Sequence, residues 1–172
     1  NTNAVTLLDV IDKTISPMGG RLLKRWLALP LKSTDKIRER HEIVAHLKAN
    51  DEVLEKLRHW TKQMGDLERL ISKVATGKIN PKEVVQLKNS LEAALPIKQL
   101  ASKSENPSLQ KLGSALYSCD SLREKIKEML NEEAPVTIGK GKTIAKNYSK
   151  ELDELRELAF SSKDYLDKML QR

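Results

Sequence analysis

Prolines that follow a capping residue mark helix starts in this sequence, and they constrain the fold more than any other feature. Pro17 stands at the head of one apolar stripe, and Asn80-Pro81 and Asn106-Pro107 each precede another. Proline is tolerated in the first helical turn, where its missing N–H would have no partner, and asparagine is a favoured N-cap. The sequence therefore predicts a chain of separate helices, each with a defined beginning.

Apolar residues recur at helical spacing between these signals. The clearest stripe is Leu67, Leu70, Ile71, Val74 and Ala75, which follows the i, i+3, i+4 pattern of an amphipathic helix. The expected helices cover residues 17–29, 34–48, 50–62, 66–76, 80–95, 106–116 and 120–133. Pro96 should kink or stop the fifth of these. Leu109, Leu112 and Leu116 are expected to face inward from the sixth.

The composition agrees with an all-α fold. Only 3% of the 172 residues are aromatic, whereas 32% are charged and 39% apolar. This balance favours helices over a β-sandwich, which is richer in aromatic and β-branched side chains. No apolar run is long enough to cross a membrane, and the N-terminus lacks the pattern of a signal peptide. The single cysteine, Cys119, cannot form an internal disulfide, so a reducing cytoplasm is expected.

The last quarter of the sequence carries two further predictions. Val136-Thr137-Ile138 and Thr143-Ile144-Ala145 flank two glycines, which predicts a short β-hairpin over residues 136–146. A long helix is then expected from about Ser149 to the last residue, with neither cap nor breaker at its end. The predicted fold class is thus an all-α, multi-helix bundle with a long C-terminal helix and one short hairpin.

No catalytic, cofactor-binding or metal site is predicted. Lys142-Thr143 follows Gly141 as in a phosphate-binding P-loop, but position 136, where the loop needs its first glycine, is Val136. The histidines His41, His46 and His59 lack the spacing and partners of a zinc site. Adjacent carboxylates such as Glu132-Glu133 diverge on a helix, so they cannot work as a catalytic pair. This chain is therefore not expected to be an enzyme.

Basic residues are the remaining candidates for function. The formal net charge is +7, and Lys140, Lys142 and Lys146 lie in a stretch from Val136 to Lys150 that contains no acidic residue. Such lysines could contact nucleic-acid phosphates, as could Arg21, Lys24 and Arg25 on one helix face. A solvated basic surface is an equally good interpretation of both groups.

Three segments resemble the core domain of MutS-type mismatch-repair proteins. The first comprises Thr6 to Thr14, Pro17 to Leu27 and Pro30-Leu31, and the second is Gly65-Asp66-Leu67-Glu68-Arg69-Leu70. The third comprises Ile144-Ala145, Tyr148, residues 151–156 and residues 164–166. The segments follow the family's order and spacing over essentially the whole chain. Asn147 and Ser149 depart from the pattern, which usually has Gly and Asn there.

The resemblance implies that residues 1–172 are the first part of a MutS-like core, or lever, domain, cut before the DNA clamp. The family's mismatch-recognition and ATPase domains would lie outside the chain, so ATP and Mg²⁺ would bind elsewhere in the parent protein. The implied role is to relay the ATP state to the clamp. The implied partners are mismatched double-stranded DNA, a second copy in a homodimer and downstream repair factors, in a bacterial, nucleoid-associated cytoplasmic protein.

One alternative remains open at this point. A stand-alone basic helical domain that binds nucleic acid directly would have the same composition and charge. It predicts salt-dependent binding of duplex DNA that charge reversal at Lys140 and Lys142 would weaken.

Overall fold

The computed structural model describes the backbone of residues 4–170 and the side chains of residues 4–162. Over this range the chain forms helices joined by turns and loops, with no strand, which confirms the all-α prediction. The helices are α1 (Leu7–Ile11), α2 (Pro17–Ala28), α3 (Thr34–Ala49), α4 (Asp51–Gln63), α5 (Leu67–Ala75), α6 (Pro81–Ser102), α7 (Pro107–Ala115), α8 (Asp120–Met129) and α9 (Lys150–Leu170).

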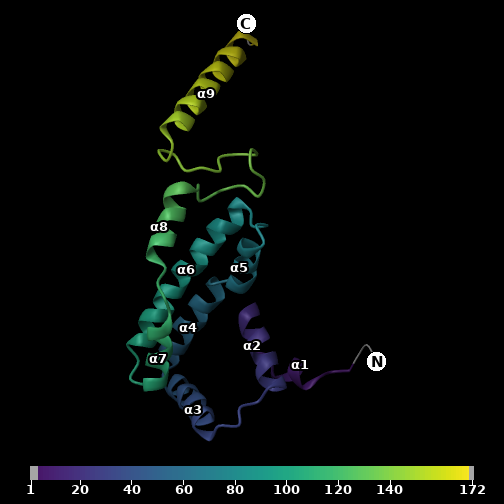
Figure 1. Cartoon of the computed structure of the whole chain (residues 1–172), viewed down its shortest axis with the longest axis vertical. Helices are drawn as coiled ribbons and strands as arrows, with labels where there is room; N and C mark the ends of the chain where they lie inside the picture. The colour runs from purple at the N-terminus through teal and green to yellow at the C-terminus, as the bar shows by residue number, and fades with distance from the viewer. Residues whose placement is uncertain (1–3, 171–172) are drawn as a thin grey trace.

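Helix α6 is the centre of the fold, and α4, α5, α7 and α8 pack against it. Helix α3 extends this body by packing on α4 and α7. Figure 1 shows an elongated molecule, with α1 and α2 beside the body and α9 at the far end, where it carries the C-terminus. The buried apolar side chains belong mostly to α6 and its neighbours: Leu70, Val85, Leu87, Ala93, Ala101, Leu109, Ile126 and Ala134.

The start of α6 follows the sequence signal. Asn80 is the N-cap, and its side chain accepts a 3.0 Å hydrogen bond from the backbone N–H of Glu83. The Glu83 carboxylate in turn accepts from the backbone N–H of Asn80, which completes a capping box. Pro81 occupies the first turn, as predicted.

Of the two outcomes expected at Pro96, a kink or a stop, the stop is wrong, because α6 continues through Pro96 to Ser102. An internal proline costs a helix about 3 kcal/mol through its missing N–H and its ring. Burial of Ala93 before Pro96 and of Ala101 after it attaches both halves of α6 to the body. This tertiary packing outweighs the local cost.

Helix α7 packs unusually closely on the end of α6. Gly113 is buried, and a Cβ built on it would lie 2.4 Å from the backbone N of Ser102. Leu109 faces inward as predicted, with 6% of its surface exposed. The same prediction is wrong for Leu112 and Leu116, which are 57% and 38% exposed. The contact face of α7 is thus made by Leu109 and a glycine instead of a continuous leucine stripe.

The predicted β-hairpin over residues 136–146 is not formed. Ile144 pairs instead with Leu130, in an isolated antiparallel bridge, and Val136 and Ile138 are exposed. Gly139 and Gly141 both have positive φ, at 87° and 129°, and the N–H of Lys140 donates to the carbonyl of Thr137. These turns redirect the chain, and residues 143–145 pair with the segment where α8 ends. Helix α8 ends at Met129 and not at residue 133, where the prediction placed its end.

The described chain begins with a short helix, α1, and ends with a long projecting helix, α9. Helix α1, which the apolar periodicity did not predict, is capped by Thr6 and Asp9 in a reciprocal capping box. Helix α9 covers residues 150–170 of the helix expected over 149–172, and residues 171 and 172 lie outside the described range. Leu155, Leu158 and Phe160 on α9 are each more than half exposed.

Candidate functional site

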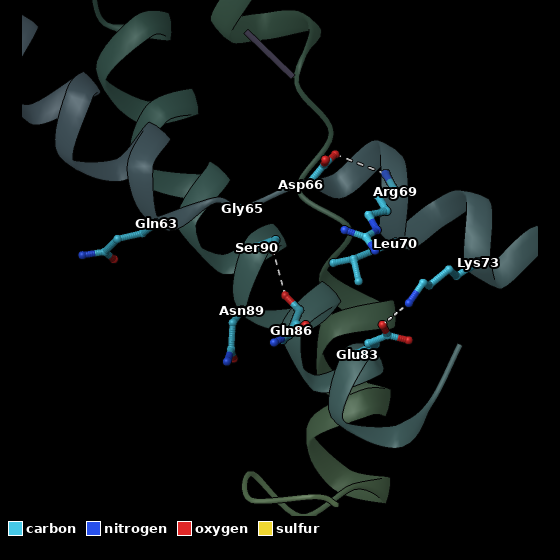
Figure 2. A pocket seen from close by; sticks show the side chains of 10 residues that line it. All are labelled: Gln63, Gly65, Asp66, Arg69, Leu70, Lys73, Glu83, Gln86, Asn89 and Ser90. Atoms are coloured by element: carbon cyan, nitrogen blue, oxygen red, sulfur yellow. Dashed lines mark hydrogen bonds and ion pairs between the residues drawn. The ribbon is translucent and has the colours of Figure 1, made fainter. Parts of the chain in front are cut away.

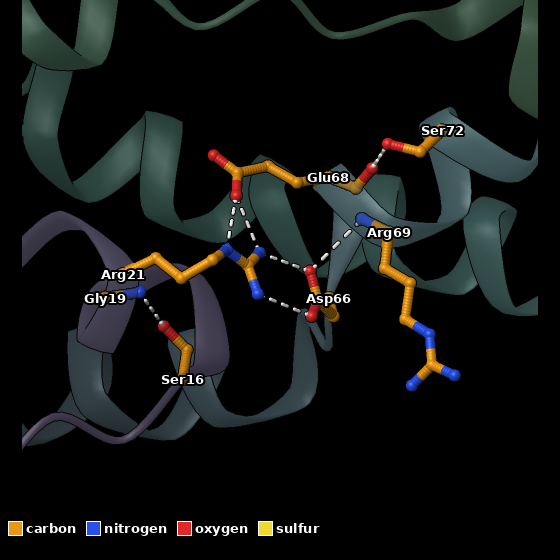
Figure 3. Close-up of polar contacts among 7 residues, drawn as sticks. All are labelled: Ser16, Gly19, Arg21, Asp66, Glu68, Arg69 and Ser72. Carbon is orange, nitrogen blue, oxygen red and sulfur yellow. Dashed lines mark hydrogen bonds and ion pairs between the residues drawn. The ribbon is translucent and has the colours of Figure 1, made fainter. Parts of the chain in front are cut away.

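A bidentate ion pair joins α2 to the start of α5. The Arg21 guanidinium donates from Nη2 to Asp66 Oδ1 at 2.7 Å and from Nη1 to Asp66 Oδ2 at 3.0 Å. Its Nε donates to Glu68 Oε2 at 2.7 Å (Figure 3). The planar guanidinium matches the carboxylate in this geometry, which makes it one of the stronger kinds of charged contact.

Asp66 has a second role at the same place. It is the N-cap of α5, where Oδ1 accepts a hydrogen bond from the backbone N–H of Arg69. Hydrogen bonds from Arg21 hold the pKa of Asp66 below its ordinary value, and the Arg69 N–H lowers the pKa further, against the opposing effect of partial burial. Asp66 therefore stays ionised at neutral pH, as both the helix N-terminus and Arg21 favour.

This ion pair brings together the first two of the three family-like segments. Arg21 lies in the segment that begins at Pro17, and Asp66 and Glu68 lie in the segment that begins at Gly65. Trp26 provides a second link from α2, because the guanidinium carbon of Arg40 on α3 lies 3.5 Å from the centre of its ring. The expectation that Arg21 is available to phosphates is corrected, since its guanidinium is occupied by two carboxylates.

An open polar groove of about 520 Å³ lies between α5 and α6, next to this ion pair. Figure 2 shows its lining, in which Leu70 and Ser90 are buried and Lys73 forms an ion pair with Glu83. Its lining consists mainly of amide and charged side chains: Gln63, Asp66, Arg69, Lys73, Glu83, Gln86 and Asn89. The hydrogen bond from Lys73 and the one from the backbone N–H of Asn80 lower the pKa of Glu83. The Glu83 carboxylate thus stabilises the start of α6 and its link to α5.

The third family-like segment forms a compact hydrogen-bonded cluster where the loop meets α9. Arg156 donates from Nη2 to the carbonyl of Ile144 at 3.0 Å and from Nη1 to Asp153 Oδ1 at 2.9 Å. Asp153 Oδ2 accepts from the backbone N–H of Asn147 at 2.6 Å. This backbone hydrogen bond, followed by Arg156, holds the pKa of Asp153 below its ordinary value.

Asn147 adopts the left-handed conformation, with φ of 70°. Its departure from the family's usual glycine is therefore explained, because asparagine tolerates this region better than other side chains do. We expect Asn147→Gly to change the thermal midpoint of unfolding very little, since the bond to Asp153 uses the backbone N–H. A β-branched side chain is strained there, so Asn147→Val should lower stability by about 1–2 kcal/mol. Equal midpoints for the two variants would contradict this explanation.

The three lysines predicted to contact nucleic acid all lie on the surface of the loop between α8 and α9. Lys142 and Lys146 line one open groove of about 540 Å³ together with Ile144, Arg156 and Phe160. Lys140 lies outside this groove, between Gly139 and Gly141. The structure thus brings two of the three together and exposes all of them.

The loop around Lys142 does not have the form of a nucleotide-binding loop. A phosphate cradle needs its backbone N–H groups at the start of a helix, whereas residues 143–145 pair with residues 129–131 and the next helix begins at Lys150. Within residues 4–170, the side chains that the structure describes, those of residues 4–162, include no group of three or more His, Cys, Asp or Glu placed to hold a metal ion. None of the helices in that range is long and apolar enough to cross a membrane.

Comparison with known proteins identifies the family. The chain is 62% identical over 170 residues to the DNA mismatch repair protein MutS of Christiangramia forsetii, which covers 99% of this chain. It is 59% identical over 167 residues to the MutS protein of Flavobacterium johnsoniae, covering 97% of the chain. The MutS protein of Parabacteroides distasonis is 48% identical over all 172 residues. The chain spans about a fifth of the length of each of these relatives.

The family model described as MutS domain III matches residues 1–171. The segments that it spans include the Arg21–Asp66 ion pair and the Arg156 cluster described above. The chain belongs to the MutS family and corresponds to its domain III.

Proposed function

We propose that this domain acts as a lever in a DNA mismatch-repair protein, relaying the ATP state of the parent protein to a clamp that grips DNA. The observation that carries the proposal is the placement of α9, which leaves the helical body and points away from it (Figure 1). A helix of 21 residues spans about 30 Å at 1.5 Å per residue, so a small rotation at its base displaces its far end considerably.

In this proposal the domain transmits motion and carries out no chemistry. ATP and Mg²⁺ would act in another part of the parent protein. A rigid element couples two sites when both of them bias the same two-state arrangement. The core domain would then move first, and its motion would be passed on to the clamp.

The partners of the parent protein are proposed from its relatives, which are named DNA mismatch repair proteins. Mismatched double-stranded DNA would be bound by the full-length protein as a homodimer, and downstream repair factors would respond to the nucleotide-bound state. A bacterial cytoplasm, close to the nucleoid, is where such a DNA-bound protein would work. The relatives' names support this role more than a stand-alone nucleic-acid-binding domain.

A proline in α9 tests the lever directly. Leu155→Pro in the full-length protein should interrupt α9 near its base, because proline removes a helical hydrogen bond and clashes with the preceding turn. We expect ATP-induced release of DNA to be lost while ATP hydrolysis in the absence of DNA stays measurable. The two activities are measured by the dissociation of a labelled mismatched duplex and by phosphate release.

The matched control is Leu155→Ala, which shortens the same 57% exposed side chain but preserves the helix. It should leave ATP-induced release close to that of the natural protein. Normal ATP-induced release in a folded Leu155→Pro variant would contradict the lever.

We also propose that Lys140, Lys142 and Lys146 face the DNA backbone in the parent protein. Their exposure and the absence of acidic residues between Val136 and Lys150 support this role. Reversing Lys140 and Lys142 to glutamate should weaken duplex binding most at low salt. The slope of log K against log salt should flatten by about 0.9 for each DNA phosphate that the variant no longer neutralises.

Lys78→Glu with Lys82→Glu is the matched control, because it changes the net charge equally at two exposed positions on another part of the surface. Binding is measured by titration of a duplex at several salt concentrations. If both double variants shift affinity and slope alike, the effect comes from net charge and these lysines make no specific contact.

A further inference from the structure

The position of α9 depends on a loop and not on helix packing. The extensive helix–helix contacts of the described chain lie among α3, α4, α5, α6, α7 and α8, and none of them involves α9. Residues 130–149 connect α8 to α9 and contain the contacts that attach α9 to the body. The direction of α9 must therefore be set by how this loop is fixed at both ends.

On the body side, a buried lysine holds the first turn of the loop. Lys88 of α6 is only 4% exposed, and its Nζ lies 2.5 Å from Glu132 Oε1. A lysine is rarely buried so deeply without a charged partner, because its ammonium would lose its hydration. Ala134, two residues after Glu132, is also 4% exposed and anchors the same turn. The turn is thus attached to α6 by one ion pair, and its Ala134 side chain is buried.

Within the loop, backbone hydrogen bonds carry this attachment toward α9. The N–H of Asn131 donates to the carbonyl of Thr143 at 2.9 Å, and the N–H of Ala145 donates to the carbonyl of Met129 at 3.0 Å. These two bonds flank the bridge between Leu130 and Ile144. Residues 143–145 are therefore fixed to the segment that follows α8.

On the α9 side, Arg156 completes the connection to the bridge, while Asp153 holds the backbone N–H of Asn147 nearer to the helix. Arg156 donates to the carbonyl of Ile144, the bridge residue, while Asp153 of the same helix orients the guanidinium. The Arg156 side chain is 28% exposed and Asp153 20%, so both are partly shielded from water. Contacts then run without a gap from α6 through the loop to the second turn of α9.

We propose that Lys88, Glu132 and Arg156 are positioning residues that fix the direction of α9 relative to the helical body. Together they form the α9 joint. Lys88 has a second carboxylate within reach, because Glu92 on its own helix lies 3.9 Å from Nζ. Loss of the contact with Glu132 would therefore not leave the buried ammonium without a charged partner. The mechanical use of the joint rests on the proposed lever function, whereas its geometry does not.

The test measures the direction of α9 in the full-length protein. Spin labels are placed on α6 and α9 through Gln99→Cys and Ser161→Cys, both at exposed positions, with Cys119→Ser and without other reactive cysteines. The distance between the labels is measured by pulsed electron resonance. Glu132→Ala and Arg156→Met should each broaden the distance distribution at least twofold. Glu132→Gln, a milder change, should broaden it less.

Two matched controls separate the joint from general effects of charge. Glu133→Ala removes the neighbouring exposed carboxylate, and Lys150→Met removes an exposed cation at the start of α9. Both should leave the distribution narrow. A narrow distribution in folded Glu132→Ala and Arg156→Met variants would overturn the proposed joint, whatever happens to DNA release.

ATP-induced DNA release, measured on the same variants, distinguishes this proposal from the lever function. Broadened distances with normal release would support the joint and contradict the lever. Broadened distances with lost release would support both. Narrow distances with lost release would overturn the joint and leave the coupling to other residues.

Discussion

Replacing Gly113 with alanine should lower the free energy of unfolding by about 3 kcal/mol, at the upper end of the range for overpacked cores. The added Cβ would lie 2.4 Å from the backbone N of Ser102 and 2.7 Å from the backbone carbon of Ala101. Neither backbone atom can move aside as the end of a flexible side chain would. Helix α7 would have to shift away from α6, which would also expose part of Leu109.

The direction of this effect is opposite to that of helix propensity. In an exposed helix, Gly→Ala stabilises by about 1 kcal/mol, because alanine loses less backbone entropy. Urea unfolding of the 172-residue chain measures which effect dominates. Ser114→Ala, at the exposed neighbouring position on α7, is the control and should stay within about 0.5 kcal/mol of the natural chain. A stabilised Gly113→Ala variant would contradict the close packing of α7 on α6.

Helix starts could be predicted from the sequence because they are determined by local chemistry. Asn80 and Asn106 cap their helices through hydrogen bonds to residues three positions ahead, and Pro81 and Pro107 stand in the first turns. These interactions need no distant partner. Helix α1 carried a comparable signal in Thr6 and Asp9, whose capping box could have revealed it.

Helix ends and faces were predicted less well because they depend on tertiary contacts. Pro96 does not stop α6, since burial on both sides of it stabilises the helix. Residues 143–145 form hydrogen bonds with the chain after α8 and not with residues 136–138, a choice that no local pattern specifies. Ile71 and Leu112 lie on apolar stripes but are both 57% exposed, because periodicity marks a face without saying what covers it.

At the candidate site, too, local features could be predicted from the sequence, whereas contacts between distant residues could not. The family-like segments around Arg21 and Asp66 could be identified from the sequence, but their direct contact could not, because 45 positions separate them. Sequence reasoning grouped Arg21 with Lys24 and Arg25 as a basic face, whereas Arg21 is committed to Asp66 and Glu68. The left-handed conformation of Asn147, with φ of 70°, was not predicted, although the family's usual glycine at this position is the signal that could have revealed it.

Asp66→Ala should lower the free energy of unfolding by about 2 kcal/mol, because one carboxylate serves two purposes. Loss of an N-cap costs about 1 kcal/mol. Loss of the bidentate ion pair with Arg21 should add a similar amount, reduced from the full value for a charged hydrogen bond because Arg21 is half exposed. Urea unfolding of the same chain measures the total. Helix α2 should also lose its main polar link to α5, so its backbone amides should exchange hydrogen faster.

Asp66→Asn separates the two contributions, because the amide oxygen can still cap α5 while the charge that attracts Arg21 is gone. It should cost about half as much as the alanine variant, since only the cap of about 1 kcal/mol survives. Glu52→Asn is the control, because this exposed carboxylate pairs only within α4. Equal losses for Asp66→Asn and Asp66→Ala would assign the whole effect to the charge and none to the cap.

The pH dependence of stability gives a second check on the charge of Asp66. Its pKa in the folded chain is lowered, chiefly by Arg21, so the stabilisation from its charge is complete above the unfolded pKa of about 3.9. That stabilisation is lost as the pH falls below this value and through the lower folded pKa. Between pH 5 and pH 3 the natural chain should therefore lose more stability than Asp66→Asn does. Parallel curves for the two chains would show that the ionised Asp66 contributes nothing through Arg21, and the ion pair between α2 and α5 would then be an incidental contact.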